Sequence, residues 1–392
     1  MEDPKIIESR QKTLKYVLYL SALVYFGQGI ESLPYQPFKF YLKNLGWTPS
    51  KVMFVGSLLT LAWLIKPVIG YLVDRFASKK LWVLSSALTS CVISCLIGTI
   101  NLPLGLILLL MGVANWNAAV RDVAVDGLMC VTGKESQATG AIQSAQWIAV
   151  TFAGVLVGFS GGWIADHLTF KNAFLILAPF YLLLCFYILK FGKEKPKEVL
   201  PTLSKYKELF TNKRFLGACL FLFLYMFSPS FGTPLYYIET DKFKWSQTFI
   251  GTIASIGAIC SIIGAVIYYK ISKIINVKKW LVTSVFIGAC TSLAYLYFTP
   301  VTDIAYAIIF GLVGMIIHLI AMDWMARTTL PGIEATSFAL LCSISNLAGT
   351  VSTWTGAWLL PIVGLQPLII LSAVTSFACL PLIKFINKEE PK

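Results

Sequence analysis

Long apolar runs recur along the whole chain and limit what it can fold into. A run of roughly 17–25 apolar residues can cross a bilayer as a helix, which satisfies its own backbone hydrogen bonds. Of the 392 residues, 57% are hydrophobic and only 13% are charged, whereas soluble domains carry about 25% charged residues. We predict an all-α polytopic membrane protein with twelve transmembrane helices. The expected spans are 16–41, 49–73, 81–100, 104–130, 138–164, 173–189, 215–237, 247–271, 280–298, 304–325, 335–360 and 366–385.

The lysines and arginines between these runs predict an orientation. With both termini inside, the cytoplasmic segments hold about four times as many of these residues as the opposite side, in agreement with the positive-inside rule. We expect a multi-pass protein of the cell (inner) membrane. The first twelve residues are acidic early and lack an apolar signal segment, so we expect them to form a cytoplasmic tail.

Several classes of function do not fit this composition. The net charge of +13 is spread between apolar runs, and no basic soluble segment suited to nucleic acid is present. The nine cysteines form no CxxC pair, and the two histidines match no metal-ligand spacing. The sequence also lacks a nucleotide-binding P-loop. We expect no enzyme activity, no catalytic residue, no metal and no cofactor, and a monomer in the lipid bilayer.

One basic segment divides the chain into two similar halves. We predict an amino-terminal six-helix bundle at 1–189, a cytoplasmic linker at 190–214 and a carboxyl-terminal six-helix bundle at 215–392. Short similar segments recur about 200 residues apart, as expected for structural repeats. Trp47-Thr48 returns as Trp245-Ser246, each with a predicted hydroxyl N-cap, and Pro34 returns as Pro234. Two such halves are typical of a carrier with a midplane site.

Glycine and proline interrupt the first and seventh runs. These interruptions lie at Gly27–Pro34 and at Ser228–Pro234. Irregular backbone inside a membrane is tolerated where protein or a cavity covers it. A lined cavity and a simple packing kink both explain such a break, and Gln28 and Glu31 beside the first one favour the cavity.

The run at 104–130 carries Arg121, Asp122 and Asp126. A charge at the centre of a spanning helix costs roughly 2.5–3.5 kcal/mol on insertion scales. These groups therefore need partners or a water-filled cavity. Asp122 and Asp126 share one helical stripe, and Arg121 lies on the stripe beside it.

The segment GYLVDRFASKK at 70–80 resembles the loop motif of the major facilitator superfamily. Its glycine would permit close helix contact, and its aspartate could cap a neighbouring helix N-terminus. The resemblance implies that the motif's Arg75 pairs with Asp126, which would make Asp126 a gate latch. The expected gating residues are Gly70, Asp74, Arg75, Asp126 and Glu334, the last as a cap at the start of the eleventh helix.

Further stretches resemble the narrower folate–biopterin transporter family. They are FYLKNLG at 40–46, WLIKPVIG at 63–70, DVAVD at 122–126, GAIQS at 140–144 and PGIEATSFALLCSISN at 331–346. The chain departs from the family in its short loops and in Phe76-Ala77 within the loop motif. The resemblance implies a secondary active transporter of folate or pterin-type compounds that works by alternating access.

The chemistry of such a substrate suggests site residues. Carboxylates accept the paired N–H donors of a pteridine, aromatic rings stack on it, and a cation binds the glutamate tail of a folate. Tyr35 and Phe227 are further possible stacking surfaces. The expected substrate-binding residues are Gln28, Glu31, Lys66, Trp116, Arg121, Asp122, Gln143, Gln146, Trp147 and Asn346. Alternatively, Lys66, Arg121 and Asp122 simply neutralise one another.

Proton coupling needs a poorly solvated carboxyl, and Glu31, Asp122 and Asp323 qualify by position. Two other functions remain open. One is a carrier of another bulky anionic metabolite, as in the muropeptide permeases. The other is a non-transporting membrane sensor or enzyme, for which the sequence offers no catalytic constellation or appended soluble domain.

Overall fold

The computed structural model describes residues 4–47, 55, 59, 61–63, 65–191, 202–245 and 247–385, and every regular element in that part is a helix. Much of the predicted span 49–73 and of the linker 190–214 lies outside the described residues, as do the predicted caps Thr48 and Ser246. The chain divides into two compact units. The first comprises Met1–Pro201 with Thr329–Ala339, and the second comprises Thr202–Thr328 with Leu340–Lys392.

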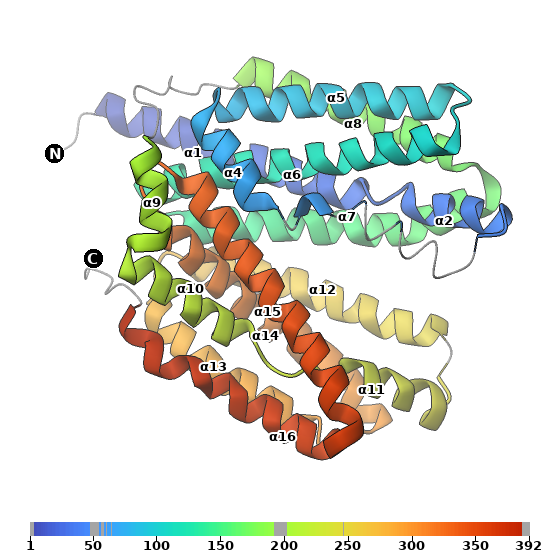
Figure 1. Cartoon of the computed structure of the whole chain (residues 1–392), viewed down its shortest axis with the longest axis vertical. Coiled ribbons are helices and arrows are strands. Elements are labelled where there is room, and N and C mark those ends of the chain that lie inside the picture. Colours follow the sequence, from blue (N-terminus) through green and yellow to red (C-terminus); the bar gives the residue numbers. More distant parts are fainter. Residues whose placement is uncertain are drawn as a thin grey trace. The chain divides into compact units, whose positions relative to one another are not determined.

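The first unit is a bundle of long helices that run side by side (Figure 1). In chain order its elements are α1 (Pro4–Ile30), α2 (Tyr35–Asn44), η1 (Leu61–Trp63), α4 (Lys66–Arg75), α5 (Lys79–Thr99), α6 (Leu104–Glu135), α7 (Thr139–His167) and α8 (Phe170–Phe191). Helix α1 packs along α7 and α6, and α5 packs along α8 and α6. Helix α6 thus lies among α1, α4, α5 and α7.

The second unit holds the remaining elements. They are α9 (Leu203–Thr211), α10 (Lys213–Met226), α11 (Gly232–Tyr237), the π-helical turn η2 (Ile238–Lys242), α12 (Gln247–Ile271), α13 (Val277–Ala294), α14 (Pro300–Thr328), α15 (Glu334–Val363), α16 (Leu365–Thr375) and η3 (Ser376–Phe385). The first residues of α15, up to Ala339, belong with the first unit. Asparagine side chains cap two of these helices: Asn212 accepts from backbone N–H groups at the start of α10, and Asn276 does so for α13.

Within the described residues, each of the twelve predicted spans contains helix. Within the described residues, eight helices are long and apolar enough to cross a membrane, and the bent pair α9 and α10 makes a ninth if it is one span. The first predicted helix is broken into α1 and α2, and the seventh into α10 and α11, where glycine and proline predicted interruptions. The break in the seventh helix leaves α10 with 14 residues and α11 with 6, so neither is long enough to cross a bilayer alone.

Corresponding helices pack together in each unit, as expected for pseudo-symmetric halves. The pair formed by the second and fourth predicted helices is α4 with α6 in one unit and α12 with α14 in the other. The third predicted helix of each half packs against the fourth, as α5 with α6 and as α13 with α14. The third also packs against the sixth, as α5 with α8 and as α13 with α16.

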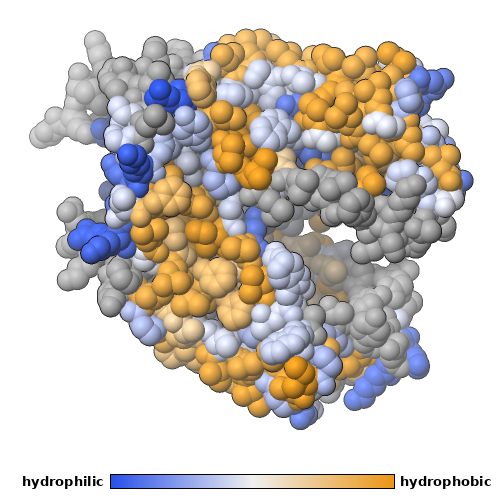
Figure 2. Space-filling view, viewed as in Figure 1, coloured by the Kyte–Doolittle hydropathy of each residue, from blue (hydrophilic) through white to orange (hydrophobic). Residues whose placement is uncertain are grey.

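The outer faces of the helices are apolar. Figure 2 shows broad hydrophobic surface along the helices, with the most hydrophilic residues gathered near the helix ends. On α8, Leu182, Leu183, Phe186 and Leu189 are more than half exposed, whereas Leu184 and Ile188 are fully buried in the bundle. Apolar exposure of this extent is expected of helices that face lipid.

Helices α12 and α14 approach closely because glycines line their contact. A Cβ added at Gly264 would collide with the carbonyl oxygen of Leu312, and one at Gly311 would collide with that of Gly257. Ser261 Oγ donates to the Gly311 carbonyl over 3.0 Å across the same contact. Small residues that permit close backbone approach are a common device for helix association in membranes.

We therefore expect Gly264→Val to destabilise the second unit by about 1–3 kcal/mol through overpacking. Gly288→Val on α13 is the matched control, because a side chain there meets open space. Thermal unfolding of the detergent-purified variants measures the effect. Equal unfolding temperatures for the two variants would show that the contact tolerates a side chain.

Candidate functional site

The charged residues of α6 are almost completely buried. Arg121 and Asp122 are each 2% exposed, and Asp126 is 3% exposed. The neighbouring residues on all sides of this part of α6 are also buried, so the helix runs through the middle of its unit. Groups in such a place need opposite charges or hydrogen bonds, and the structure shows which ones they meet.

Arg121 forms an ion pair with Glu31, which lies in the turn between α1 and α2. The guanidinium also donates to the Ser86 carbonyl over 3.0 Å and to Ser90 Oγ over 2.9 Å, both on α5. It lies over the ring of Tyr181 from α8, 5.2 Å from the ring centre. Arg121 thus joins three other helical segments to α6.

Asp122 forms a separate ion pair with Lys66, at the start of α4. Its Oδ1 also accepts from Gln28 Nε2 of α1 over 2.7 Å. Successive residues on a helix point about 100° apart, so Arg121 and Asp122 face different neighbours. Of the two cations predicted inside the spans, Lys66 is the counter-ion of Asp122, whereas Arg121 pairs with Glu31.

Asp126 lies one turn further along the same stripe. Its Oδ1 accepts from Tyr25 Oη of α1 over 2.9 Å and from Gln146 Nε2 of α7 over 3.1 Å. The predicted pairing of Asp126 with Arg75 is wrong for this structure, because the carboxylate points into the bundle toward α1 and α7. Gln146 was predicted as a substrate contact and instead holds this carboxylate.

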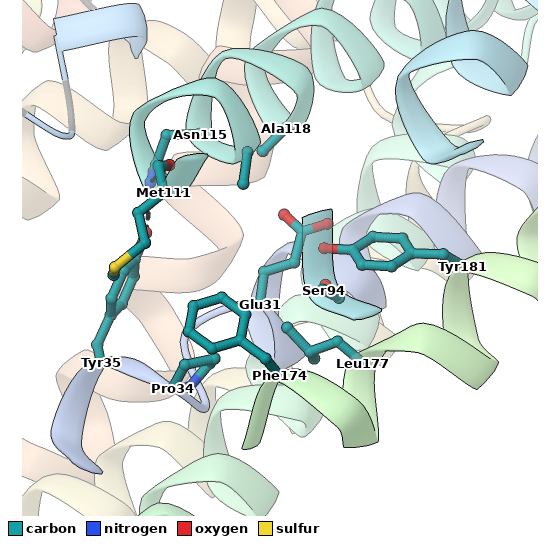
Figure 3. Close-up of a pocket in the computed structure, with 11 residues that line it drawn as sticks. Glu31, Pro34, Tyr35, Ser94, Met111, Asn115, Ala118, Phe174, Leu177 and Tyr181 are labelled. Atoms are coloured by element: carbon teal, nitrogen blue, oxygen red, sulfur yellow. Dashed lines mark hydrogen bonds between the residues drawn. The ribbon is translucent and has the colours of Figure 1, made fainter. Parts of the chain in front are cut away.

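A small pocket opens beside Glu31, as Figure 3 shows. It measures about 30 Å³, which is room for water but not for a bicyclic ring. Tyr35 Oη donates to Asn115 Oδ1 over 2.9 Å at one side of it. Its lining comprises Glu31, Pro34, Tyr35, Ser94, Met111, Ala114, Asn115, Ala118, Phe174, Leu177 and Tyr181. The break in the first helix therefore lines a small cavity, as predicted.

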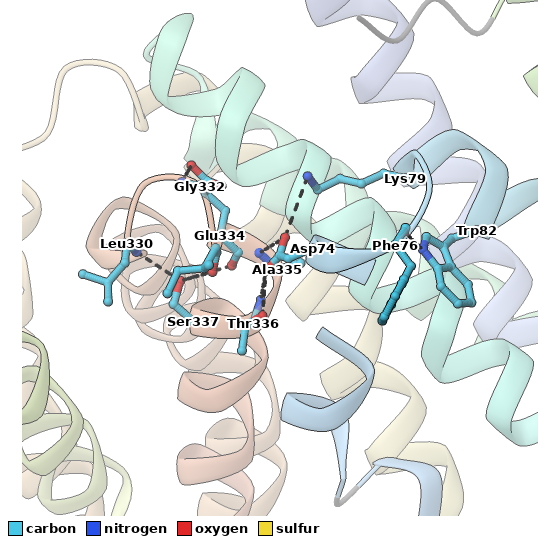
Figure 4. A network of polar contacts seen from close by, with 11 residues as sticks. Asp74, Phe76, Lys79, Trp82, Leu330, Gly332, Glu334, Ala335, Thr336 and Ser337 are labelled. Carbon is cyan, nitrogen blue, oxygen red and sulfur yellow. Dashed lines mark hydrogen bonds and ion pairs between the residues drawn. The ribbon is translucent and has the colours of Figure 1, made fainter. Parts of the chain in front are cut away.

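The loop motif at 70–80 holds the start of α15 (Figure 4). Asp74 accepts from the backbone N–H and the hydroxyl of Thr336, each over 2.7 Å. Lys79 Nζ lies 3.9 Å from the same carboxylate. A Cβ at Gly70 would lie 2.7 Å from Thr336 Cα. The predicted capping aspartate and the predicted close approach at the glycine are both seen.

Two further contacts fix the segment before α15. Glu334 accepts from the backbone N–H of Gly332 over 2.9 Å. Lys134, in the last turn of α6, donates to the Thr329 carbonyl over 2.7 Å and also to the Thr329 hydroxyl. Lys134 is in none of the predicted sets of site residues. A basic residue in the last turn of a helix was the available signal, but its partner is distant in sequence.

Five other predicted residues do not join the two ion pairs of α6. Trp116 lines a separate apolar groove on α6, and Gln143 donates to Met129 Sδ over 3.6 Å. Asp323, in the second unit, accepts from Tyr268 Oη and from the Arg327 guanidinium, each over 2.9 Å. Asn346 is exposed on α15, and Trp147 is half-buried on α7.

The break in the seventh helix is held by serines that the sequence analysis did not single out. Ser230 N–H donates to the Ser352 carbonyl over 3.0 Å, and Ser228 Oγ donates to the Ser372 carbonyl over 3.1 Å. Ser352 Oγ in turn donates to the Ser228 carbonyl. Hydroxyl groups thus replace helical hydrogen bonds at the irregular backbone. Phe227, a predicted stacking surface, caps the end of α10 just before the break.

Comparison with known proteins agrees with this architecture. The family model of the Major Facilitator Superfamily matches residues 17–330. The chain is 26% identical to the folate-biopterin transporter of Synechocystis sp., over 94% of this chain and 81% of that protein. It is 24% identical to the probable folate-biopterin transporter 4 of Arabidopsis thaliana, over 89% of each. It is 22% identical to folate transporter 2 of Plasmodium falciparum, over 91% of this chain and 83% of that protein.

Two solved structures have the same fold at low sequence identity. The human organic anion transporter MFSD10 (TETRAN) aligns with a TM-score of 0.69 at 13% identity, over 97% of this chain and 100% of that one. The transporter FucP in its outward conformation aligns with a TM-score of 0.72 at 13% identity, over 96% of this chain and 99% of that one.

The two ion pairs predict a specific pattern of coupling in a double-mutant cycle. Arg121→Met leaves Glu31 buried without its partner and should cost about 3–5 kcal/mol of stability. Adding Glu31→Leu should recover most of this loss, because both charges are then gone. The measurement is thermal unfolding of the purified variants.

Lys66→Met combined with Glu31→Leu is the matched control, since these residues belong to different pairs. This combination should show much weaker coupling than the first. Equal coupling in the two cycles would mean that the four charges act as one cluster and not as two pairs.

Proposed function

Because the chain belongs to the Major Facilitator Superfamily, and within it to the folate–biopterin transporter family, we propose that it is a secondary transporter of folate or pterin-type compounds. Members of this superfamily are transporters, and the chain is accordingly not an enzyme. We propose alternating access between its two halves as the transport mechanism. The names of its relatives in three groups of organisms support the substrate class.

The observation that carries the proposal is the pair of neighbouring ion pairs on α6. Arg121 with Glu31 and Lys66 with Asp122 place two cations and two carboxylates within one unit, next to a break in a helix. Each of the four charges is neutralised by its partner. A substrate that carries both kinds of group can exchange partners with the pairs, so that no buried charge is left alone at any stage.

A folate has the groups that such an exchange requires. The N–H and amino donors of its pteridine edge suit a carboxylate, and the carboxylates of its glutamate tail suit a cation. We propose that Glu31 and Asp122, with Gln28, receive the ring edge and that Lys66 and Arg121 receive the tail. Since the pocket beside Glu31 has a volume of only about 30 Å³, enough for water but not for a bicyclic ring, binding of the ring requires a wider opening than this structure has.

The contacts of the loop motif support a gating role. Asp74, Gly70 and Lys79 hold the start of α15 in the first unit, and Glu334 stabilises the turn before it. We propose that these contacts form and break during the transport cycle. A gating role for Arg75 stays a prediction, and Asp126 belongs to the interior of the bundle.

The coupling ion and the cellular setting are also proposals. We propose that protons drive transport through Asp122 or Glu31, that both termini are cytoplasmic and that the protein lies in the cell membrane. The excess of lysine and arginine on one side supports this orientation. Because the buried charges of the first unit meet their partners within one chain, we propose a monomer as the working unit.

Uptake of radiolabelled folate into proteoliposomes tests the substrate and the role of Lys66 together. Wild-type protein should accumulate folate above empty liposomes, with competition by unlabelled pterin. Lys66→Ala should weaken competition by folate about 10–100-fold, the worth of a charged hydrogen bond, and leave competition by a pterin without the tail nearly unchanged.

Lys213→Ala, an exposed change on α10, should behave as wild type in both competitions. Equal losses for folate and pterin in Lys66→Ala would assign Lys66 a structural role only. If neither folate nor any reduced pterin enters above the liposome background, the substrate is another anionic metabolite and the substrate proposal fails.

Asp122→Asn tests the proton role. The amide keeps an oxygen that accepts from Gln28 but cannot carry a proton across, so folate binding should persist while accumulation driven by an inward proton gradient is lost. Glu135→Gln, an exposed change at the end of α6, should leave accumulation intact. Unchanged accumulation in Asp122→Asn would remove Asp122 from proton coupling.

A further inference from the structure

A pair of carboxyl groups lies in the second unit, apart from the ion pairs of α6. Glu239 is in η2, the turn that follows the broken seventh helix, and Asp303 is in the first turn of α14. On the predicted topology, both lie at the side that faces away from the cytoplasm. Neither residue was singled out by the sequence, because they are far apart in the chain and belong to no motif.

The two carboxyl groups are within hydrogen-bonding reach of each other. Ionised carboxylates are acceptors only, so a hydrogen bond between them requires a proton on one. Asp303 is 8% exposed, and its Oδ2 has no hydrogen-bond partner within the described part of the chain. A second, unshared negative charge at this place would be poorly solvated and close to a like charge.

Among the described residues, no cation forms an ion pair with Glu239 or Asp303. Lys242 and Lys244 are the nearest cations along the chain from Glu239, and both are exposed to solvent. The elements packed against α14 are α12 and α13. In α12 the only charged residue is Lys270, at the opposite end of the helix.

Two tyrosines of the surrounding helices complete the environment. The hydroxyl of Tyr306 donates to the carbonyls of Ala294 over 2.8 Å and of Tyr297 over 3.1 Å, and therefore not to the pair. The ring of Tyr295 packs 5.1 Å from that of Tyr306. These groups supply apolar cover without a positive charge.

The position of each carboxyl group indicates where the proton lies. Asp303 is at the amino end of a long helix, where the helix dipole stabilises a carboxylate. Glu239 has no such support. Burial, and next to it the charge of Asp303, raise the pKa of Glu239 to about 7. The described residues offer no cluster of three or more metal-binding side chains, so a proton suits this place better than a metal ion.

We propose that Glu239 and Asp303 form a proton-binding site, in which one proton shared between the two carboxyl groups fastens η2 to the first turn of α14. The site is separate from Glu31 and Asp122, and it does not depend on the identity of the transported substrate. Since the protonated form of Glu239 is favoured in the folded protein, the contact stabilises the fold at low pH. That stabilisation is lost as the pH rises through about 7.

Infrared difference spectroscopy of the purified full-length protein tests this site directly. Between about pH 8 and about pH 6, the wild type should gain a protonated-carboxyl C=O band that titrates near neutral pH. Glu239→Gln should lack this band, because the amide replaces the proton-carrying group. Glu208→Gln, an exposed change on α9, should retain it.

Asp303→Asn tests the pairing, and it keeps the proposal testable if Glu239→Gln does not fold. Removal of the neighbouring charge should shift the Glu239 band to lower pH, because only burial then raises the pKa of Glu239. The proton site would be overturned if the wild type showed no such band, or if the band persisted in Glu239→Gln. A band that titrates at the same pH in Asp303→Asn would overturn the sharing of the proton.

Discussion

The cost of placing charge inside an apolar bundle organises the first unit of this transporter. Arg121 and Asp122 are adjacent on α6 and almost fully buried, and neither is tolerated there without a counter-charge. Glu31 comes from the break between α1 and α2, and Lys66 comes from the start of α4. Because each buried charge needs a counter-charge, the ion pairs join the broken first helix and α4 to the centre of the unit.

The helices and their interruptions could be predicted from the sequence because they depend on local properties. Apolar length determined the spans, and glycine and proline near Pro34 and Pro234 determined the breaks. The capping role of Asp74 also followed from a local motif. These features need little knowledge of how the helices are rotated against one another.

The partners of the buried polar groups could not be predicted in the same way. The rotation of α6 about its axis decides which neighbouring helix the Asp126 carboxylate faces, and the sequence does not encode that rotation locally. Lys134 contacts Thr329, nearly two hundred positions away. The serines that hold the seventh helix come from α15 and α16. Such contacts depend on tertiary packing, and a polar residue outside a motif does not indicate its partner.

The composition of the two ion pairs has an electrical consequence. Arg121 with Glu31 and Lys66 with Asp122 add no net charge to the first unit. The transmembrane voltage does about 2.3 kcal/mol of work per 100 mV on each net charge that crosses the field, and a neutral set of pairs experiences none. Movement of these four residues as intact pairs therefore carries no net charge across the membrane, and the net charge moved during turnover is that of the cargo and its coupling ion.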